Sequence, residues 1–498
     1  MIKKSLFLLL LFFSVFLHAQ EVDLAKLDQY FEKSLADWGT PGMSVAIVKD
    51  GQTVFSKGYG VMEAGEAARP DGNSLYAIAS NSKAFTSYVI AQLVDEGQLN
   101  WDDKVQKFLP YFELYDPWVS AQVTVKDLLC HRVGLGTFSG DVMWYKSDLT
   151  SEEIIRRMKY LEPEFSFRDG FGYSNLMYIT AGELIKKVTG KTWGQNVQER
   201  ILDSLKMDRT IYSLPKLDVV GNYTTPHAFE DGKNIPIPYT DWEEVGALGG
   251  LISSVNDMAK WMTFMMSSDN KAKNELWKLL NSYTVNRDKA NDFDMHFSGY
   301  GLGWGLSDYY GRLRVGHTGG YDGMISAVTM IPDEKLGVVV LSNGMNPPMM
   351  AVTYYALNAF LGEETKDWSA ALLKRKEERS KKDTRVEERL ASRVEGTHPS
   401  LELEEYTGTY KADIYGNIEV KLENGKLRVY FERSPELSAT LEHWHFDVWK
   451  LDWDIMHAWF NFGTLKFNMD NNLKITGMDF DVPNNDIFFE ELKPRKVN

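Results

Sequence analysis

Alternation of apolar and polar residues predicts β-strands in two separate parts of the chain. Residues 43–60, MSVAIVKDGQTVFSKGYG, contain two β-rich runs joined by Asp50-Gly51, a dipeptide that favours a hairpin turn. Runs with β character return at residues 300–306, 311–317, 324–332 and 335–343. The pattern therefore predicts an antiparallel sheet with strands from both parts.

Between these strands the apolar residues recur at helical spacing. The segment after Ser80 has apolar residues four apart and a stop signal at Gly97, so we expect a core-facing helix whose first turn carries Ser80. Residues 123–280 are mostly helical in pattern, as at 175–190 and 253–266. This order of elements predicts an α+β domain, an antiparallel sheet flanked by helices with a helical insertion.

The remainder of the chain has a different pattern. A charge-dense run, residues 374–396, has too few apolar residues for a core and is interpreted as a solvated linker helix. From Tyr406 onward strand patterns return, with hairpin signals at Asn424-Gly425 and Asn471-Asn472, which predicts a small all-β, barrel-like domain. We divide the 498 residues into a signal peptide (1–19), an α+β domain (20–365), a charged linker (366–400) and a C-terminal β domain (401–498).

The first 19 residues are typical of a secretory signal peptide. Lys3 and Lys4 precede an apolar run from Leu6 to Leu17, and the small residue Ala19 follows. The run is too short to be a good membrane span. We therefore expect cleavage near residue 19 or 20 and a periplasmic or secreted bacterial protein with no membrane span after the signal is removed.

Composition narrows the function classes. Hydrophobic residues make up 44% of the chain and charged residues 25%, which indicates a globular protein. The formal net charge of −15 disfavours nucleic acid as a partner. We find no phosphate-binding glycine loop, and the histidines of the β domain have no fourth ligand at metal-like spacing, so we expect neither cofactor nor metal. The single cysteine, Cys130, is interpreted as a buried small apolar residue without a disulfide partner.

A serine and a lysine stand three residues apart at Ser80 and Lys83. Residues at this spacing share a helix face, so the Lys83 amine can reach the Ser80 hydroxyl and act on its proton. The Ser80 N–H, near a helix start, is suited to stabilising an oxyanion. The pattern alone is weak, because Ser268 and Lys271 repeat it in a polar turn. The alternative is a helix-capping serine followed by a solvated lysine.

Tyr173 and Asn175 precede a predicted helix and form a second candidate motif. Tyrosine is a poor base unless a nearby cation favours the phenolate, and we expect Lys83 to be that cation. A similar pair, Tyr415 and Asn417, lies in the β domain and outside the candidate site. The alternative for Tyr173 and Asn175 is a helix cap and a packed ring.

The third candidate motif is His317-Thr318-Gly319-Gly320, at the end of a predicted strand. Glycines at Gly319 and Gly320 would let a substrate approach the backbone closely, and the Gly320 N–H is a candidate second oxyanion donor. The alternative for His317 is a structural histidine at a strand end.

Together these motifs resemble the serine β-lactamase and penicillin-binding protein superfamily, and most closely its class C-like branch, which includes CubicO-type hydrolases, D-aminopeptidases and family VIII esterases. The resemblance spans roughly residues 27–361. It implies that Ser80 attacks a carbonyl to form an acyl-enzyme, with Lys83 and Tyr173 sharing the base role. Tyr173 would also protonate the leaving group, and the amides of Ser80 and Gly320 would bind the oxyanion. Asn175, His317 and Gly319 would complete the substrate site.

Two departures from the family pattern bear on the substrate. Where β-lactamases carry Lys-Thr-Gly, this chain has His317-Thr318-Gly319, and an imidazole is charged only part of the time near neutral pH. Residues 131–135, HRVGL, replace the usual His-Thr-Ser-Gly-Leu and are interpreted as structural. We therefore expect amide or ester hydrolysis of a small molecule or peptide, with cell-wall-derived D-amino acid peptides as one class, rather than antibiotic resistance.

A second function remains open from the sequence. The pocket of a binding or sensor protein could recognise a peptide or lactam without turning it over. The intact set Ser80, Lys83, Tyr173 and Asn175 favours the enzyme. The β domain after the charged linker keeps the binding protein open, because such a domain could gate the site or bind a partner.

Overall fold

The computed structural model describes residues 22–285 and 295–497. The predicted signal peptide, residues 1–19, lies outside these ranges and stays a prediction. Within them, no helix has the length and apolar character needed to cross a bilayer.

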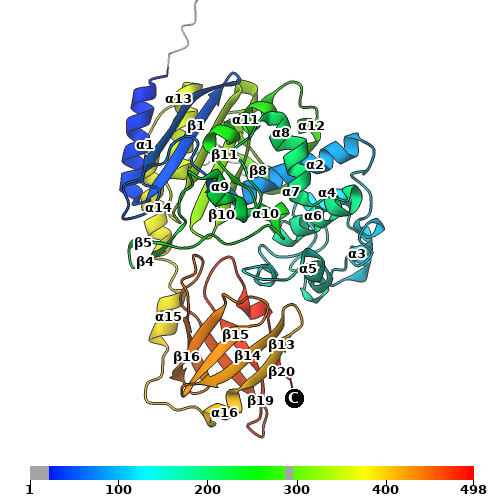
Figure 1. Ribbon diagram of the computed structural model, residues 1–498, viewed down its shortest axis with the longest axis vertical. Helices are drawn as coiled ribbons and strands as arrows, with labels where there is room; N and C mark the ends of the chain where they lie inside the picture. The colour runs from blue at the N-terminus through cyan, green and yellow to red at the C-terminus, as the bar shows by residue number, and fades with distance from the viewer. Residues whose placement is uncertain (1–21, 286–294, 498) are drawn as a thin grey trace, which may run out of the picture.

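The larger domain is built on one antiparallel sheet of eight strands, in the order β2-β1-β12-β11-β10-β9-β8-β7 (Figure 1). Val45 of β1 stands opposite Val340 of β12, so strands from the two ends of the domain pair directly, as the sequence predicts. The strands are β1 (Gly42–Lys49), β2 (Gln52–Gly60), β7 (Asn281–Val285), β8 (Phe297–Tyr300), β9 (Gly305–Tyr309), β10 (Arg312–Tyr321), β11 (Met324–Ile331) and β12 (Leu336–Ser342).

The turns of this sheet test the strand predictions. Asp50 and Gly51 have φ angles of 51° and 79°, the positive values that a two-residue type I′ turn needs, so the first hairpin is confirmed. The strand predicted at 300–306 is wrong, because this segment is mainly the turn between β8 and β9. Gly303 has φ 79°, which interrupts the extended conformation that the pattern indicated.

Helices cover both faces of the sheet (Figure 1). Val338 and Val340 of β12 pack in a cluster with residues of α1 (Leu24–Trp38) and α13 (Met349–Leu361). The alternate residues, Val339 and Leu341, pack in a second cluster, which includes residues of α11 (Val255–Met266). Two-sided burial explains why β12 is apolar at successive positions.

The helical insertion lies between α2 and β7, as predicted. Its helix at 175–190 is confirmed, and Gly190 ends it in the left-handed conformation with φ 73°. The helices are α2 (Ser82–Asp95), α3 (Pro117–Gln122), α4 (Val125–Leu129), α5 (Ser151–Arg157), α6 (Asn175–Thr189), α7 (Trp193–Val197), α8 (Asp203–Leu205), α9 (Leu217–Val220), α10 (Gly246–Gly249), α11 (Val255–Met266) and α12 (Lys273–Leu276). Two short ribbons accompany them, formed by β3 (Tyr76–Ala77) with β6 (Ile252–Ser253) and β4 (His227–Glu230) with β5 (Lys233–Pro236).

The C-terminal domain is a closed barrel of eight strands, which confirms the predicted all-β, barrel-like domain. The hairpin at Asn424-Gly425 joins β14 to β15 through a two-residue turn, since Glu423 pairs with Lys426. The elements are α16 (Leu403–Tyr406), β13 (Gly408–Ala412), β14 (Gly416–Glu423), β15 (Lys426–Phe431), β16 (Ser438–His445), β17 (Val448–Trp453), β18 (Thr464–Met469), β19 (Ile475–Asp481) and β20 (Arg495–Lys496).

The charged linker forms two helices rather than one solvated helix, α14 (Trp368–Ser380) and α15 (Arg385–Ala391). Trp368 and Ser369 at the start of α14 are buried, and Ser369 N–H donates to the Tyr30 hydroxyl of α1 at 2.8 Å. On α15, Arg389 pairs with Asp481 of the barrel at 2.6 Å. The linker therefore packs against both domains, and its charged residue Arg389 forms an ion pair with the barrel.

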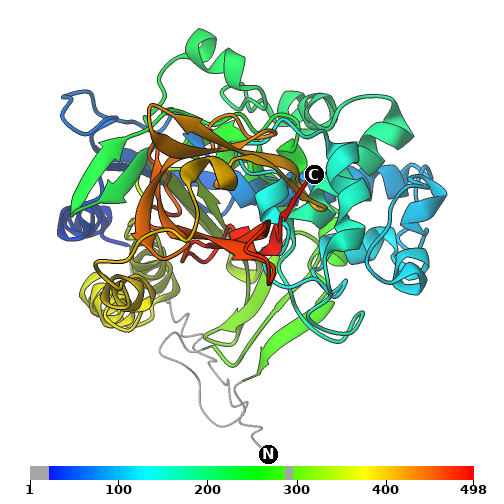
Figure 2. The same ribbon diagram turned by 90° about the horizontal axis from the view of Figure 1, so that it is seen from below.

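The barrel is docked against the helical insertion, as Figure 2 shows from below. Arg433 of the barrel pairs with Asp148 at 2.5 Å. The Glu491 carboxylate accepts hydrogen bonds from the Ser139 hydroxyl at 2.6 Å and the Gly140 N–H at 2.7 Å. These contacts place loops of the barrel beside the segment that follows Gly140. Residues of this segment belong to the candidate active site.

Candidate active site

Ser80 lies in a short 3-10 turn, Ala79–Asn81, directly before α2. The α-helix itself begins at Ser82, so Ser80 precedes the first turn in which the sequence placed it. The turn starts with Ala79 at φ 46°, a left-handed conformation that is strained for alanine. The Asn81 side chain donates to Ser326 Oγ at 2.8 Å on β11 and helps to hold the turn. This arrangement presents a partly exposed Ser80 hydroxyl at the end of a buried helix.

Lys83 is fully buried and joins the first two motifs. Its Nζ donates to Asn175 Oδ1 and to the Leu248 carbonyl oxygen, each at 2.7 Å, and lies 2.9 Å from Ser80 Oγ, within hydrogen-bond distance. Burial lowers the pKa of Lys83 to about 7, although the nearby Asp141 acts in the opposite direction. Near neutral pH a large share of Lys83 is therefore a neutral amine that can accept a proton from Ser80.

Asn175 begins α6 and is held in one orientation by a residue that the sequence analysis did not identify. Its Nδ2 donates to Asp141 Oδ2 at 2.6 Å, which turns the amide oxygen toward Lys83. Burial raises the pKa of Asp141 to about 8, against the lowering effect of hydrogen bonding from Trp144 and Asn175. Asp141 stands in no recognisable motif, so only the tertiary structure shows that it belongs to the site.

Replacing Asp141 by alanine is expected to lower kcat/KM by about 10-fold to 100-fold, because Asn175 loses the acceptor that fixes its orientation. Asp141→Asn keeps an acceptor oxygen and should recover most of this loss. Steady-state kinetics on an ester substrate would measure both. Equal losses in the two variants would contradict a positioning role through the Asn175 amide.

Tyr173 lies beside Lys83, but it does not have the environment of a phenolate. Lys83 Nζ lies over the face of the Tyr173 ring, 4.9 Å from its centroid. Burial raises the pKa of the Tyr173 hydroxyl above its ordinary value; the neighbouring Ser80 hydroxyl lowers this pKa and Asp141 raises it, both by less than burial does. The expectation that Lys83 stabilises a Tyr173 phenolate is therefore wrong for the free protein, where Tyr173 stays a phenol.

His131, in the segment interpreted as structural, positions the second motif. It is fully buried, and its Nδ1 accepts a hydrogen bond from the backbone N–H of Ser174 at 3.0 Å. Its ring packs on Tyr173 with 4.2 Å between centroids. Since Ser174 stands between Tyr173 and Asn175, His131 fixes the backbone that presents both side chains.

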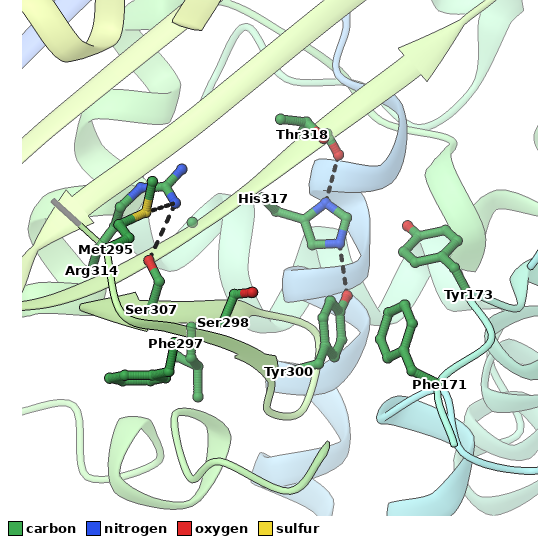
Figure 3. A pocket seen from close by; sticks show the side chains of 13 residues that line it. Phe171, Tyr173, Met295, Phe297, Ser298, Tyr300, Ser307, Arg314, His317 and Thr318 are labelled. Carbon is green, nitrogen blue, oxygen red and sulfur yellow. Dashed lines mark hydrogen bonds between the residues drawn. The ribbon is translucent and has the colours of Figure 1, made fainter. Parts of the chain in front are cut away.

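The His317 ring lies between Thr318 and Tyr300 and contacts both, as Figure 3 shows, and these contacts hold it as a neutral imidazole. Its Nδ1 is 2.5 Å from the Thr318 carbonyl oxygen, which can only accept, so the proton is on Nδ1. Its Nε2 then accepts from the Tyr300 hydroxyl at 2.7 Å. Burial and, to a smaller extent, the charge of Lys83 lower the pKa of His317 to about 3, although the hydrogen bond to Thr318 acts in the opposite direction. His317 therefore does not supply the fixed cation that a lysine would supply there.

The two glycines of the third motif allow two close approaches within the protein. A Cβ on Gly319 would lie 2.3 Å from the Ile78 carbonyl oxygen and 2.9 Å from the Ser80 nitrogen. A Cβ on Gly320 would lie 2.8 Å from the ring of Trp459, a residue of the barrel. The close contact at Gly319 brings β10 against the turn that carries Ser80. The packing of these two segments therefore requires a residue without a side chain at position 319.

These residues surround a cavity of about 250 Å³. Its wall includes the Ser80 hydroxyl and side chains of Tyr173 and Asn175, and the barrel contributes Trp459 and Asp486. The C-terminal domain therefore covers one side of the site. A second cavity of about 450 Å³ adjoins it on the other side of His317; its lining includes Phe171, Phe297, Tyr300, Arg314 and Thr318 (Figure 3).

Within residues 22–285 and 295–497, no group of three or more His, Cys, Asp or Glu side chains is arranged to hold a metal ion.

Comparison with known proteins places these observations in a family context. The family model "Beta-lactamase" matches residues 27–361, and the model "Domain of unknown function (DUF3471)" matches residues 392–496. The unguisins hydrolase ungD' of Aspergillus campestris is 29% identical over 434 residues, covering 82% of this chain and 80% of the relative.

Two solved structures share the fold. The octameric penicillin-binding protein homologue from Pyrococcus abyssi aligns with a TM-score of 0.63 and 24% identity, covering 93% of this chain and 98% of that chain. The D-stereospecific amidohydrolase from Streptomyces sp. aligns with a TM-score of 0.55 and 23% identity, covering 69% of this chain and 100% of that chain. These likenesses confirm the fold class expected from the motifs.

Proposed function

Because this chain belongs to the β-lactamase family of hydrolases, we propose that it is a serine hydrolase that cleaves amide or ester bonds through an acyl-enzyme on Ser80. One observation carries the proposal. The Nζ of a fully buried lysine lies 2.9 Å from a partly exposed serine hydroxyl, and burial lowers the pKa of that amine to about 7. Such an amine is a base matched to neutral pH.

In the acylation step, Ser80 Oγ forms a bond to the substrate carbonyl carbon while its proton moves to Lys83 Nζ. The carbonyl electron pair moves to oxygen, and the backbone N–H groups of Ser80 and Gly320 stabilise the resulting oxyanion. The oxyanion then collapses, the bond to the leaving amine or alcohol breaks, and the acyl group remains on Ser80.

Tyr173 has the properties of the acid in this step. Its raised pKa keeps the phenol protonated, so it can give a proton to the leaving group as the bond breaks. The proton held by Lys83 then neutralises the phenolate. In deacylation, a water molecule gives a proton to Lys83 Nζ and attacks the carbonyl carbon of the acyl-enzyme. The bond between this carbon and Ser80 Oγ then breaks, and Ser80 Oγ takes the proton back from Lys83. The net reaction consumes one water and yields a carboxylic acid and an amine or alcohol.

The state of His317 favours general acyl hydrolysis over β-lactam hydrolysis. A neutral imidazole already bonded to Tyr300 and Thr318 offers no charge to a lactam carboxylate. We therefore propose a peptidase or esterase that acts on a small molecule or peptide, with cell-wall-derived D-amino acid peptides as one class. The signal-like residues 1–19 support a periplasmic or secreted location.

The test is intact-mass spectrometry of the protein after reaction with a fluorophosphonate, with p-nitrophenyl acetate turnover measured alongside. A single adduct is expected, absent in Ser80→Ala and unchanged in Ser268→Ala. Ser268 is a matched control, because it stands in the second Ser-x-x-Lys sequence, in an exposed turn after α11. Folded protein with neither adduct nor turnover would favour instead a binding or sensor protein that recognises peptides or lactams without cleaving them.

A further inference from the structure

The larger cavity beside the site, about 450 Å³, has one charged side chain among its described lining residues, Arg314 of β10. Tyr173 and His317 line this cavity and also the cavity that contains Ser80, so the two cavities meet at these side chains. Figure 3 shows Arg314 at one end of the row of lining side chains and Tyr173 at the other. A ligand that extends from Ser80 past Tyr173 therefore reaches a space with a fixed positive charge.

The register of the sheet places Arg314 in a row of polar side chains. Ser298 of β8 stands opposite Ser307 of β9, and Ser307 stands opposite Arg314 of β10. Residues that stand opposite each other in antiparallel strands share a face of the sheet, so the two hydroxyls and the guanidinium line the same part of the cavity. The Nη1 of Arg314 donates to Ser307 Oγ at 3.3 Å. The row therefore combines hydrogen-bond donors with one positive charge.

The guanidinium of Arg314 is poorly matched by acceptors of the protein itself. Besides Ser307, it donates at 3.8 Å to the sulfur of Met295, a weak acceptor, and its buried Nε has no hydrogen-bond acceptor. Among the described residues no carboxylate pairs with Arg314, whereas Arg312, two residues earlier on the same strand, pairs with two glutamates at 3.0 and 3.1 Å. A guanidinium left in this state is suited to bind an acceptor from outside the protein.

The position of Arg314 along β10 separates it from the point of bond cleavage. Arg314 and His317 are three residues apart, which is about 10 Å along a strand. Since each extended residue spans at most about 3.6 Å, a group at Arg314 belongs to a part of the substrate about two or three residues long. Tyr173, the proposed proton donor to the leaving group, lines both cavities. The leaving group is therefore the part of the substrate that enters the larger cavity.

Charge and shape point to a carboxylate as the group that Arg314 meets. The described lining contains no Asp, Glu or Lys side chain, so an anion meets no repulsion there. The planar guanidinium matches the two oxygens of a carboxylate, and the hydroxyls of Ser298 and Ser307 can donate to the same group. Phe171 and Phe297 supply apolar walls, which displace water and strengthen such an ion pair.

We propose that the larger cavity binds the leaving group of the substrate, and that Arg314 pairs with a carboxylate about two or three residues beyond the scissile bond. The inference rests on the proposed function, which it narrows to amides or esters whose leaving group carries such a carboxylate. The C-terminus of a short peptide and an acidic side chain present the same chemistry here. Arg314 is a specificity-determining residue in this assignment.

The test compares acetate esters whose leaving group is the phenol of a 4-hydroxybenzoyl amino acid, because a ring and one residue match the required length. The glycine derivative carries a terminal carboxylate, and the glycinamide derivative carries none. The α-amide of aspartic acid, in D and L form, carries only a side-chain carboxylate. In the wild type, kcat/KM should be at least about 10-fold higher for a carboxylate ester than for the glycinamide ester. Preference for the glycine ester alone identifies a C-terminal carboxylate as the ligand, and preference for an aspartic acid derivative identifies an acidic side chain.

Variants assign the preference to Arg314. The ratio of kcat/KM for the preferred carboxylate ester to kcat/KM for the glycinamide ester should fall at least about 10-fold in Arg314→Gln. Arg314→Lys should keep part of this ratio, because the charge remains without the planar fork. Arg312→Gln is the matched control, since it removes the same charge from the same strand at a residue that pairs with glutamates and lies outside the cavity lining. A wild-type ratio near one, or an unchanged ratio in Arg314→Gln, would overturn the proposal.

A binding measurement separates this inference from the proposed function. The free leaving groups 4-hydroxybenzoylglycine and 4-hydroxybenzoylglycinamide are titrated calorimetrically into Ser80→Ala protein, with and without Arg314→Gln. Tighter binding of the carboxylate that is lost with Arg314→Gln would support the anion site, even if the wild type proves to have no turnover. Turnover that depends on Ser80, combined with no preference for the carboxylate in either measurement, would support the hydrolase and overturn the anion site.

Discussion

Replacing Lys83 by methionine is expected to lower kcat/KM for a neutral ester by about 10³-fold to 10⁴-fold, since the general base is removed while the buried volume is nearly kept. The Nζ of Lys83 makes the 2.9 Å contact that places a proton acceptor on Ser80. Its hydrogen bonds to Asn175 and Leu248 also fix the geometry of the site. Steady-state kinetics of ester hydrolysis would measure the loss in kcat/KM, and circular dichroism would show that the variant is folded.

The pH profile identifies the base. Burial lowers the pKa of Lys83 to about 7, and the active form is the neutral amine. The kcat/KM of the wild type should therefore be constant above about pH 8 and fall about tenfold per pH unit well below pH 7. This acidic limb should vanish from the residual activity of Lys83→Met. A limb that persists unchanged in the variant would assign the titration to another group, and Lys83 would lose its role as base.

Gly319→Ala is expected to lower kcat/KM by about 10²-fold to 10³-fold while the overall fold survives. The added carbon would lie 2.3 Å from the Ile78 carbonyl oxygen and 2.6 Å from Ser326 Oγ. Backbone atoms cannot rotate away as a side chain can, so β10 must move from the turn that carries Ser80. Displacement of about 1 Å is enough to disturb the oxyanion donors on both segments.

The measurement combines ester kinetics with thermal unfolding. Gly305→Ala, on the neighbouring strand β9, is the matched control, because its added carbon would meet one backbone atom, the Gly316 oxygen, at 3.1 Å. It should retain most of the activity. Comparable activity losses in the two variants would show that the requirement for glycine comes from the sheet in general and not from the contact with the Ser80 turn.

Local patterns were sufficient for most of the secondary structure. Asp50-Gly51 and Asn424-Gly425 each specify a two-residue turn through positive φ angles, and both hairpins occur where they were predicted. Gly190 likewise ends α6 in the left-handed conformation. The failure at residues 300–306 has a local cause as well, because glycines amid aromatic residues suit a strand and a tight turn equally.

The three motifs could be recognised in the sequence because the residues of each motif lie close together along the chain. Ser80 lies in the 3-10 turn that leads into α2 and Lys83 in the first turn of α2, Tyr173 and Asn175 lie at one helix start, and Gly319 lies in one strand. The protonation states depended on tertiary structure. Burial makes Lys83 a base near neutral pH and Tyr173 a phenol, whereas the sequence suggested a cation beside a phenolate.

The sequence by itself determined the order of elements, the hairpin turns and the motif residues, because these depend on neighbours along the chain. Only the tertiary structure decided which distant groups complete the site. Asp141 stands in no motif, Tyr300 was placed only in a predicted strand without a role in the site, and Asp486 reaches the cavity from another domain. The physical reason is that hydrogen-bond partners, burial and the pKa values that follow from them are set by packing between segments far apart in sequence, and no local pattern encodes that packing.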